Sequence, residues 1–67
     1  MVNTEKLKGR IVEERKTIQI LAPKCKYSAY TLGKMISNKT PMTLEVSNIL
    51  VEELNIKREE IPDFFYK

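Results

Sequence analysis

Histidine is absent from this chain of 67 residues, and cysteine occurs once, as Cys25. Without histidine, a Ser–His or Cys–His nucleophile cannot form. One thiol cannot close an internal disulfide, and zinc sites are built mainly from histidine and cysteine. We therefore expect no metal, no cofactor and no disulfide framework, and a reducing compartment such as the cytosol.

Glycine is scarce, and long apolar runs are missing. Two isolated glycines cannot form a glycine-rich phosphate loop. No apolar run exceeds three residues, whereas a membrane-spanning helix needs about 20. The glutamate pairs at 13–14, 52–53 and 59–60 are adjacent in sequence, so on a helix they point to different sides and do not converge on a substrate. We expect a cytoplasmic protein that is not an enzyme, takes no small-molecule substrate and does not associate with membranes.

Acidic residues are missing from the middle of the chain. Between Arg15 and Leu44 there are six basic residues and no aspartate or glutamate, whereas the rest of the chain has six basic and nine acidic residues. A localised positive face of this kind suits a polyanion. The alternative is a solvated surface that merely lacks carboxylates.

The length and the 42% hydrophobic content indicate one folded domain over residues 1–67. Apolar residues at helical spacing predict a first helix from about Glu5 to Arg15, with Thr4 as its N-cap. Its buried face should contain Leu7, Ile11 and Val12. A second helix is predicted from Ile18 to Cys25 with Thr17 as its N-cap, and Pro23 should bend it or loosen its first turn.

A third helix should begin at Ser28 and end near Asn38, with its buried stripe formed by Leu32, Met35 and Ile36. Thr43 should cap a fourth helix through about Leu54. The predicted inner face of that helix comprises Leu44, Ser47, Leu50, Val51 and Leu54, with Val46 and Ile49 beside it. The tail from Lys57 to Lys67 should add a short helical turn. The predicted fold class is therefore all-α, a compact bundle of four to five short helices.

The second and third predicted helices are separated by only about three residues, the connection that a helix-turn-helix needs. Small Ala22 would let the two helices approach. The positions that should be apolar to set their crossing angle hold Leu21, Cys25, Tyr27, Leu32 and Met35. The third helix could then present its polar face to a DNA major groove.

With these residues, the sequence resembles the phage Cro and repressor family, in particular small Cro-like regulators of Gram-positive phages. The start at 7–13 and the ending at 54–56 and 60–65 resemble theirs as well. The resemblance implies a lambda-repressor-like DNA-binding domain. It also implies a transcriptional regulator, a Cro-like repressor that occludes a promoter.

The resemblance also assigns roles to individual residues. The positions that contact bases or nearby phosphates in that family hold Ser28, Ala29, Tyr30, Lys34 and Ser37. The positions that commonly hold the DNA backbone are occupied by Thr17, Gln19, Lys39 and Thr40. Because one module covers few base pairs, we expect a homodimer on double-stranded operator DNA. The aromatic cluster at 64–66, with Val46 and Ile49, could supply a dimer surface or pack within one chain.

Three residues depart from the family pattern. Lys26 stands where the turn usually has glycine, so it should adopt a positive φ. Ile18 stands where glutamine often begins the helix, and Pro23 is unusual inside it. These departures, with the apolar residues Val46 and Ile49, favour an alternative: a protein-interaction module, such as an anti-repressor or adaptor, on the same scaffold.

Overall fold

The computed structural model describes residues 1–66, which form five short α-helices and one 3-10 turn and contain no strand. In chain order the elements are α1 (Thr4–Glu13), α2 (Ile18–Cys25), α3 (Ala29–Ile36), α4 (Leu44–Glu53), the 3-10 turn η1 (Arg58–Glu60) and α5 (Ile61–Phe65). The prediction of an all-α bundle of short helices is confirmed.

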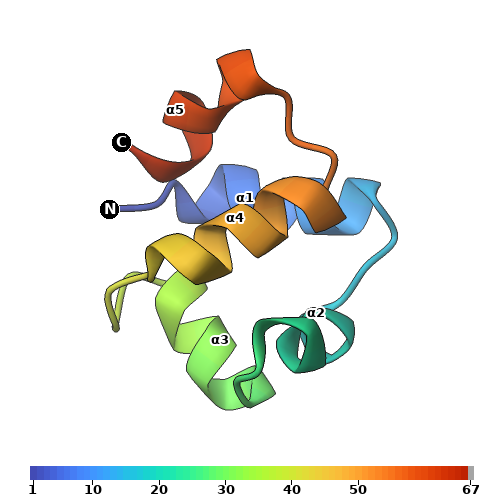
Figure 1. Cartoon of the computed structure of the whole chain (residues 1–67), viewed down its shortest axis with the longest axis vertical. Helices are drawn as coiled ribbons and strands as arrows, with labels where there is room; N and C mark the ends of the chain where they lie inside the picture. Colours follow the sequence, from blue (N-terminus) through green and yellow to red (C-terminus); the bar gives the residue numbers. More distant parts are fainter. Residues whose placement is uncertain (67) are drawn as a thin grey trace.

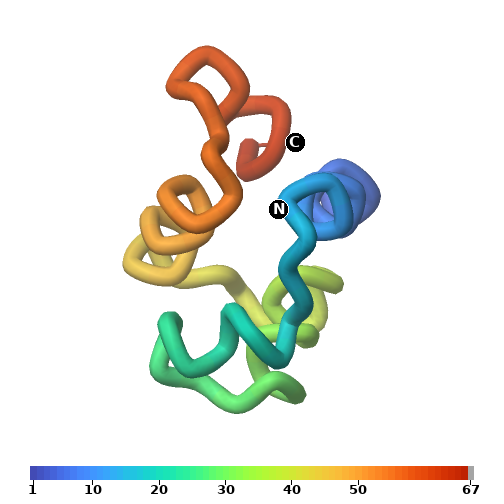
Figure 2. Tube along the Cα trace, turned by 90° about the vertical axis from the view of Figure 1, so that its right-hand side faces the viewer, coloured from blue at the N-terminus to red at the C-terminus, as the bar shows by residue number. Residues whose placement is uncertain are grey.

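The helices surround one core. In Figure 1, α4 crosses the middle of the molecule, with α2 and α3 below it and α5 above it. Seen from the side in Figure 2, α1 and α4 lie on opposite sides of the bundle. Helix α2 packs against α3 and α4, while α1 packs against α3 and α5. The two ends of the chain lie side by side, and the Asn3 N–H donates to the Phe64 carbonyl at 2.7 Å.

The N-terminal caps follow from local chemistry, because a hydroxyl can accept from a backbone N–H that has no partner inside the helix. Thr17, Ser28 and Thr43 each accept such a bond at 3.1 Å, as predicted. The prediction for α1 is wrong by one residue, since Asn3 is its cap. The Thr4 hydroxyl instead donates to the Ile36 carbonyl at 2.7 Å, which ties α1 to the end of α3.

Helix α1 ends at Glu13, two residues earlier than predicted. Arg15 takes a left-handed conformation with φ 56°, and the N–H of Lys16 bonds back to the Ile11 carbonyl, which closes the helix. Val12, predicted to be buried, is 74% exposed. It lies on the side of α1 that no other element covers.

Helix α4 buries only part of the predicted face: Leu50 and Leu54 are buried as predicted, but the first turn is rotated from the expected position. Val46 is 1% exposed and Leu44 is 71% exposed, the reverse of the prediction. The buried stripe runs along Val46, Leu50 and Leu54, which are four residues apart and therefore share one side of the helix. The other apolar residues of α4 are only partly buried.

Pro23 does not interrupt α2, which runs through it to Cys25. The first turn is closed as well, because the Thr17 carbonyl accepts from the N–H groups of Ile20 at 3.1 Å and Leu21 at 3.0 Å. The expectation of a loose first turn is therefore wrong. The ring of Pro23 lies on the exposed side of the helix, away from the core.

Candidate nucleic-acid interface

Helices α2 and α3 form a packed pair joined by residues 26–28. Lys26 has φ 63°, so the predicted positive φ is confirmed. Its N–H bonds to the Pro23 carbonyl and that of Tyr27 to the Ala22 carbonyl, both at 3.2 Å, which terminates α2. The pair buries Leu21, Ala22, Cys25, Leu32, Met35 and Ile36. Tyr27, predicted to help set the crossing angle, is instead 40% exposed.

One shallow hollow gathers most of the predicted contact residues. It lies on the outer face of α3 and on the turn that follows, and its lining consists of Ala29, Tyr30, Gly33, Lys34, Ser37 and Lys39. Four of these residues are the predicted base contacts other than Ser28, and Lys39 is a predicted phosphate contact. Residues 29, 30, 33, 34 and 37 share a helix face because they are spaced at three, four and seven residues.

Gly33 lies within the lining of this hollow. Apart from its two neighbours in the chain, a Cβ atom built at Gly33 would meet nothing within 4 Å, so there is open space beside the helix backbone there. Glycine in a helix costs about 1 kcal/mol relative to alanine. In return, the missing side chain lets a ligand approach the backbone of α3 between Tyr30 and Lys34.

Tyr30 and Lys34 form the rim of the hollow. Tyr30 is 77% exposed, and the Lys34 ammonium lies 5.3 Å from the centroid of its ring. This is a cation–π arrangement between residues four apart on one helix. The aromatic ring and the ammonium are therefore held next to each other at the surface, where both can contact a ligand.

Lys39 joins the hollow through the turn after α3. Asn38 has φ 62°, and the N–H groups of Lys39 and Thr40 both bond to the Lys34 carbonyl, at 2.9 and 3.3 Å. This turn folds back on α3 and places Lys39 beside Ser37. Thr40 does not line the hollow; it lines a separate groove.

The remaining predicted residues lie at the starts of the two helices. Ser28 Oγ accepts from the Thr31 N–H at 3.1 Å and its hydroxyl donates to Thr31 Oγ1 at 3.0 Å, so Ser28 acts as a cap outside the hollow. Thr17 caps α2 in the same way, and the Gln19 side chain is exposed on its first turn. Neither of these two lines the hollow on α3.

The basic segment is only partly free of carboxylates. Glu53 of α4 lies 3.6 Å from the Lys16 ammonium and 3.7 Å from that of Lys24. These two lysines of the basic segment are therefore paired with a carboxylate from outside it. Within residues 1–66, the other basic residues of the segment have no carboxylate within 4.0 Å: Arg15, Lys26, Lys34 and Lys39. Two of these four line the hollow.

A search of protein-family models, curated proteins and solved structures found no match to this chain.

Cys25 is buried in the core, and burial raises the pKa of its thiol, with the nearby negative charge of Glu53 adding to the effect. The thiolate, which is the reactive form, is therefore disfavoured. This supports a packing role for Cys25 over a redox-sensing one.

Among residues 1–66, no three carboxylate or thiol side chains are close enough together to bind a metal ion. No helix of this part of the chain has the length and apolar character to cross a bilayer.

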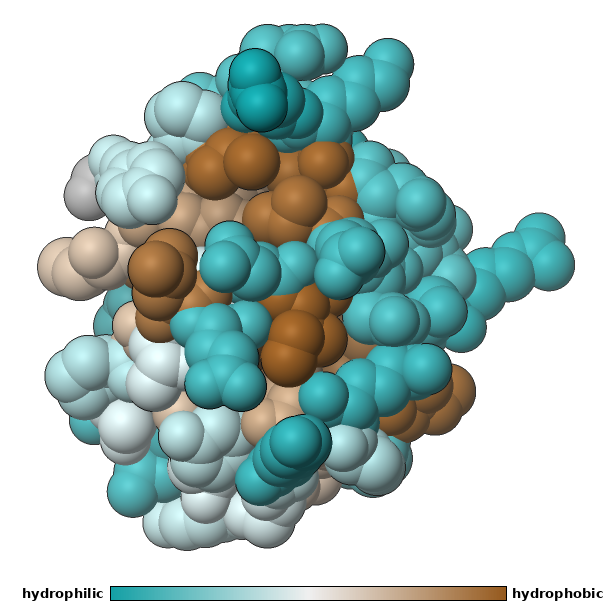
Figure 3. All heavy atoms as spheres, viewed as in Figure 1, coloured by the Kyte–Doolittle hydropathy of each residue, from teal (hydrophilic) through white to brown (hydrophobic). Residues whose placement is uncertain are grey.

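The apolar surface differs from the predicted one. Val46, Phe64 and Phe65 are packed within the chain, whereas Ile49 is partly buried and Tyr66 is exposed. Figure 3 shows apolar side chains gathered over the middle of one face, around α4, whereas the part over α3 is mostly polar. A separate groove of about 450 Å³ has a mixed apolar and polar lining, made by Met1, Val2, Asn38, Thr40, Pro41, Met42, Leu44, Ser47, Phe65 and Tyr66.

Proposed function

We propose that this chain is a sequence-specific DNA-binding transcriptional regulator that uses α2 and α3 as a helix-turn-helix. In this proposal it occludes a promoter, as the Cro-like regulators do that its sequence resembles. The observation that carries the proposal is the hollow on α3, which Tyr30, Lys34 and Lys39 line together with Gly33, where a side chain is missing. Both lysines of this hollow are free of carboxylates within 4.0 Å in residues 1–66.

This surface has the chemistry that reading a duplex requires. A B-form major groove is about 12 Å wide and admits an α-helix. The two ammonium groups can donate to guanine or to phosphate oxygens, and the Tyr30 ring can contact a thymine methyl group or donate through its hydroxyl. Each good base contact contributes about 1–3 kcal/mol of discrimination.

A second copy of the chain completes the proposal. The longest dimension of the fold is 28 Å, which is shorter than one turn of B-form DNA, about 34 Å. A single copy therefore covers few base pairs. Two copies on half-sites about one turn apart would double the contacts, and we expect a symmetric dimer at least on DNA.

Selection from a randomised duplex library tests the proposal. The tagged full chain should enrich a common sequence, and fluorescence anisotropy should then show tighter binding to that duplex than to a scrambled one. Sedimentation of the complex should give two chains per site. Failure to enrich any sequence would refute specific DNA binding, and one chain per site would refute the dimer.

The double variant Tyr30→Ala, Lys34→Ala tests the reading surface. Both side chains lie at the surface, so the fold should persist. The preference for the selected duplex should fall by at least about 30-fold, because two base contacts of about 1–3 kcal/mol are removed. Lys8→Ala, which removes an exposed lysine of α1, is the control and should leave the preference unchanged. An unaltered preference in the double variant would mean that another surface reads the DNA.

The alternative is a protein-interaction module. It is favoured by the 450 Å³ groove, whose lining includes the exposed side chains of Leu44 and Tyr66 and no charged side chain. A groove of this composition suits an apolar segment of a protein partner. The same library selection separates the two functions, since an adaptor would enrich no DNA sequence.

A further inference from the structure

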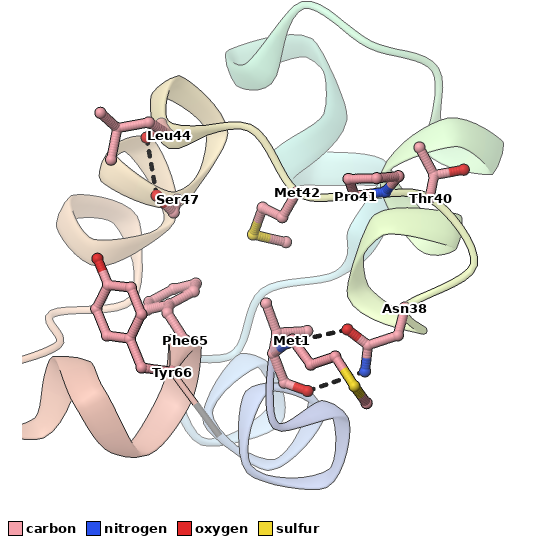
Figure 4. Close-up of a pocket in the computed structure, with 10 residues that line it drawn as sticks. Met1, Asn38, Thr40, Pro41, Met42, Leu44, Ser47, Phe65 and Tyr66 are labelled. Carbon is pink, nitrogen blue, oxygen red and sulfur yellow. Dashed lines mark hydrogen bonds between the residues drawn. The ribbon is translucent and has the colours of Figure 1, made fainter.

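Asn38 connects the end of α3 to the beginning of the chain. Its Oδ1 accepts from the Val2 N–H at 2.9 Å, and its Nδ2 donates to the Val2 carbonyl at 2.9 Å. The same Nδ2 donates to Thr4 Oγ1 at 3.3 Å. In Figure 4, the two dashed lines that start at the Asn38 side chain mark these bonds. One amide side chain thus satisfies both backbone groups of a single residue, as a neighbouring strand would.

The segment that Asn38 holds is itself well anchored. Val2 is buried, and the N–H of Asn3 bonds to the Phe64 carbonyl at 2.7 Å. The Thr4 hydroxyl adds its bond to the Ile36 carbonyl at 2.7 Å. Four hydrogen bonds therefore join residues 2–4 to the end of α3: one to the Ile36 carbonyl and three to the Asn38 side chain.

Asn38 lies between the two depressions of the surface. Its sequence neighbours Ser37 and Lys39 line the hollow on α3. Asn38 itself and Thr40 line the 450 Å³ groove, as Figure 4 shows. The turn at 37–40 is thus a wall between the two depressions, and its orientation decides where the Lys39 side chain enters the hollow.

We propose that Asn38 is a positioning residue for DNA binding, an inference that rests on the proposed function. It does not contact the duplex. Its side chain holds the turn at 37–40 against residues 2–4, so that Ser37 and Lys39 are already in place before the ligand arrives. Binding then does not have to order this turn, and the affinity is higher for that reason.

Without this side chain the hydrogen bonds that remain to the turn run back to α3, from the N–H groups of residues 37–40 to the carbonyls of Gly33, Met35 and Lys34. Those bonds end the helix but do not attach the turn to the rest of the domain. The variant Asn38→Gly removes the amide side chain without straining the backbone, because glycine accepts φ 62° at no steric cost.

The chain offers a matched control in Asn55. Asn55 follows α4, has φ 53°, and its Nδ2 donates to Glu14 at 2.7 Å, so it is also a left-handed asparagine tied to a distant segment. It does not line the hollow. Asn55→Gly therefore makes the same chemical change away from the proposed interface.

The experiment compares Asn38→Gly and Asn55→Gly for affinity to the selected duplex and for amide exchange of Lys39, at a temperature where circular dichroism shows both folded. We expect Asn38→Gly to weaken binding at least about fivefold and to speed exchange at Lys39, whereas Asn55→Gly should do neither. Equal affinities and equal exchange in the two variants would overturn the inference.

Thr4→Val tests the same set of hydrogen bonds from the side of α1. Should Asn38→Gly fail to fold, Thr4→Val removes two of the four bonds from a residue outside the hollow and should weaken binding in the same direction. An unchanged affinity in Thr4→Val would then count against the inference. Should the wild-type chain bind no duplex, the proposed function fails, and exchange at Lys39 alone decides whether Asn38 positions the turn.

Discussion

Arg10 and Glu60 join α1 to η1 across fifty residues of sequence, with Nη2 of the guanidinium donating to the carboxylate at 2.8 Å. Through Nη1 the same group donates to the carbonyls of Leu54 and Asn55, both at 3.1 Å. It also lies 5.3 Å from the centroid of the Phe64 ring. One guanidinium thus holds the C-terminal quarter of the chain onto the first helix.

The carboxylate of Glu60 should make stability depend on pH. A hydrogen bond from the Lys57 N–H and the charge of Arg10 hold its pKa below the usual value of 4.5. A carboxyl whose pKa is lowered by folding stabilises the protein above its unfolded pKa and loses that contribution as the pH falls through its folded pKa. We therefore expect Glu60→Gln to lower the melting temperature at pH 7, and the difference from wild type to vanish in acid.

Thermal melts between pH 2 and pH 7 measure this effect. Glu59→Gln is the control, because Glu59 is an exposed neighbour with the same charge and no ion pair within residues 1–66. It should match wild type throughout. If Glu60→Gln still melted at a lower temperature than wild type at pH 2, the stabilisation by Glu60 would not depend on its negative charge.

Glu53 should limit the affinity for nucleic acid. It holds Lys16 and Lys24, so Glu53→Gln frees two cations of the basic segment and removes a negative charge. Each additional phosphate contact steepens the dependence of log affinity on log salt by about 0.9. We expect tighter non-specific binding and a slope steeper by about 1 to 2 in a salt titration.

Glu52→Gln is the matched control for this prediction. Glu52 is the neighbouring residue of α4, it carries the same charge, and it pairs with no cation within residues 1–66. It should alter the salt slope much less than Glu53→Gln does. Identical slopes in the two variants would mean that the ion pairs of Glu53 do not restrain the basic segment.

Replacing Lys26 with glycine should stabilise the protein. Its φ of 63° is left-handed, a conformation that costs a residue with a side chain about 1 kcal/mol or more. Lys26→Gly removes that strain and should raise the free energy of unfolding by about 0.5–1 kcal/mol in urea denaturation. Lys8→Gly, inside α1, should lower it by about 1 kcal/mol. A destabilised Lys26→Gly would show that contacts of the lysine outweigh its backbone strain.

Local chemistry was sufficient to predict most of the helices. The caps at Thr17, Ser28 and Thr43 and the left-handed Lys26 each depend on residues within about four positions of themselves. The grouping on α3 is local too, because one helix face is set by a spacing of three and four residues. That is why the predicted contact residues of α3 lie in one hollow, and only Lys39 required the turn at 37–40 to join them.

Other features depend on residues far apart in the sequence. Helix α4 is apolar on two sides, so its periodicity could not decide whether Leu44 or Val46 faces the core, and the neighbouring helices made that choice. Glu53 lies 29 residues or more from the lysines it pairs with, and Asn38 lies 36 residues from Val2. Helices and caps are determined by the sequence itself, because their hydrogen bonds are local. The buried face of α4, the charge left free and the anchoring of the turn beside the hollow were decided by tertiary packing, because their partners meet only in the folded chain.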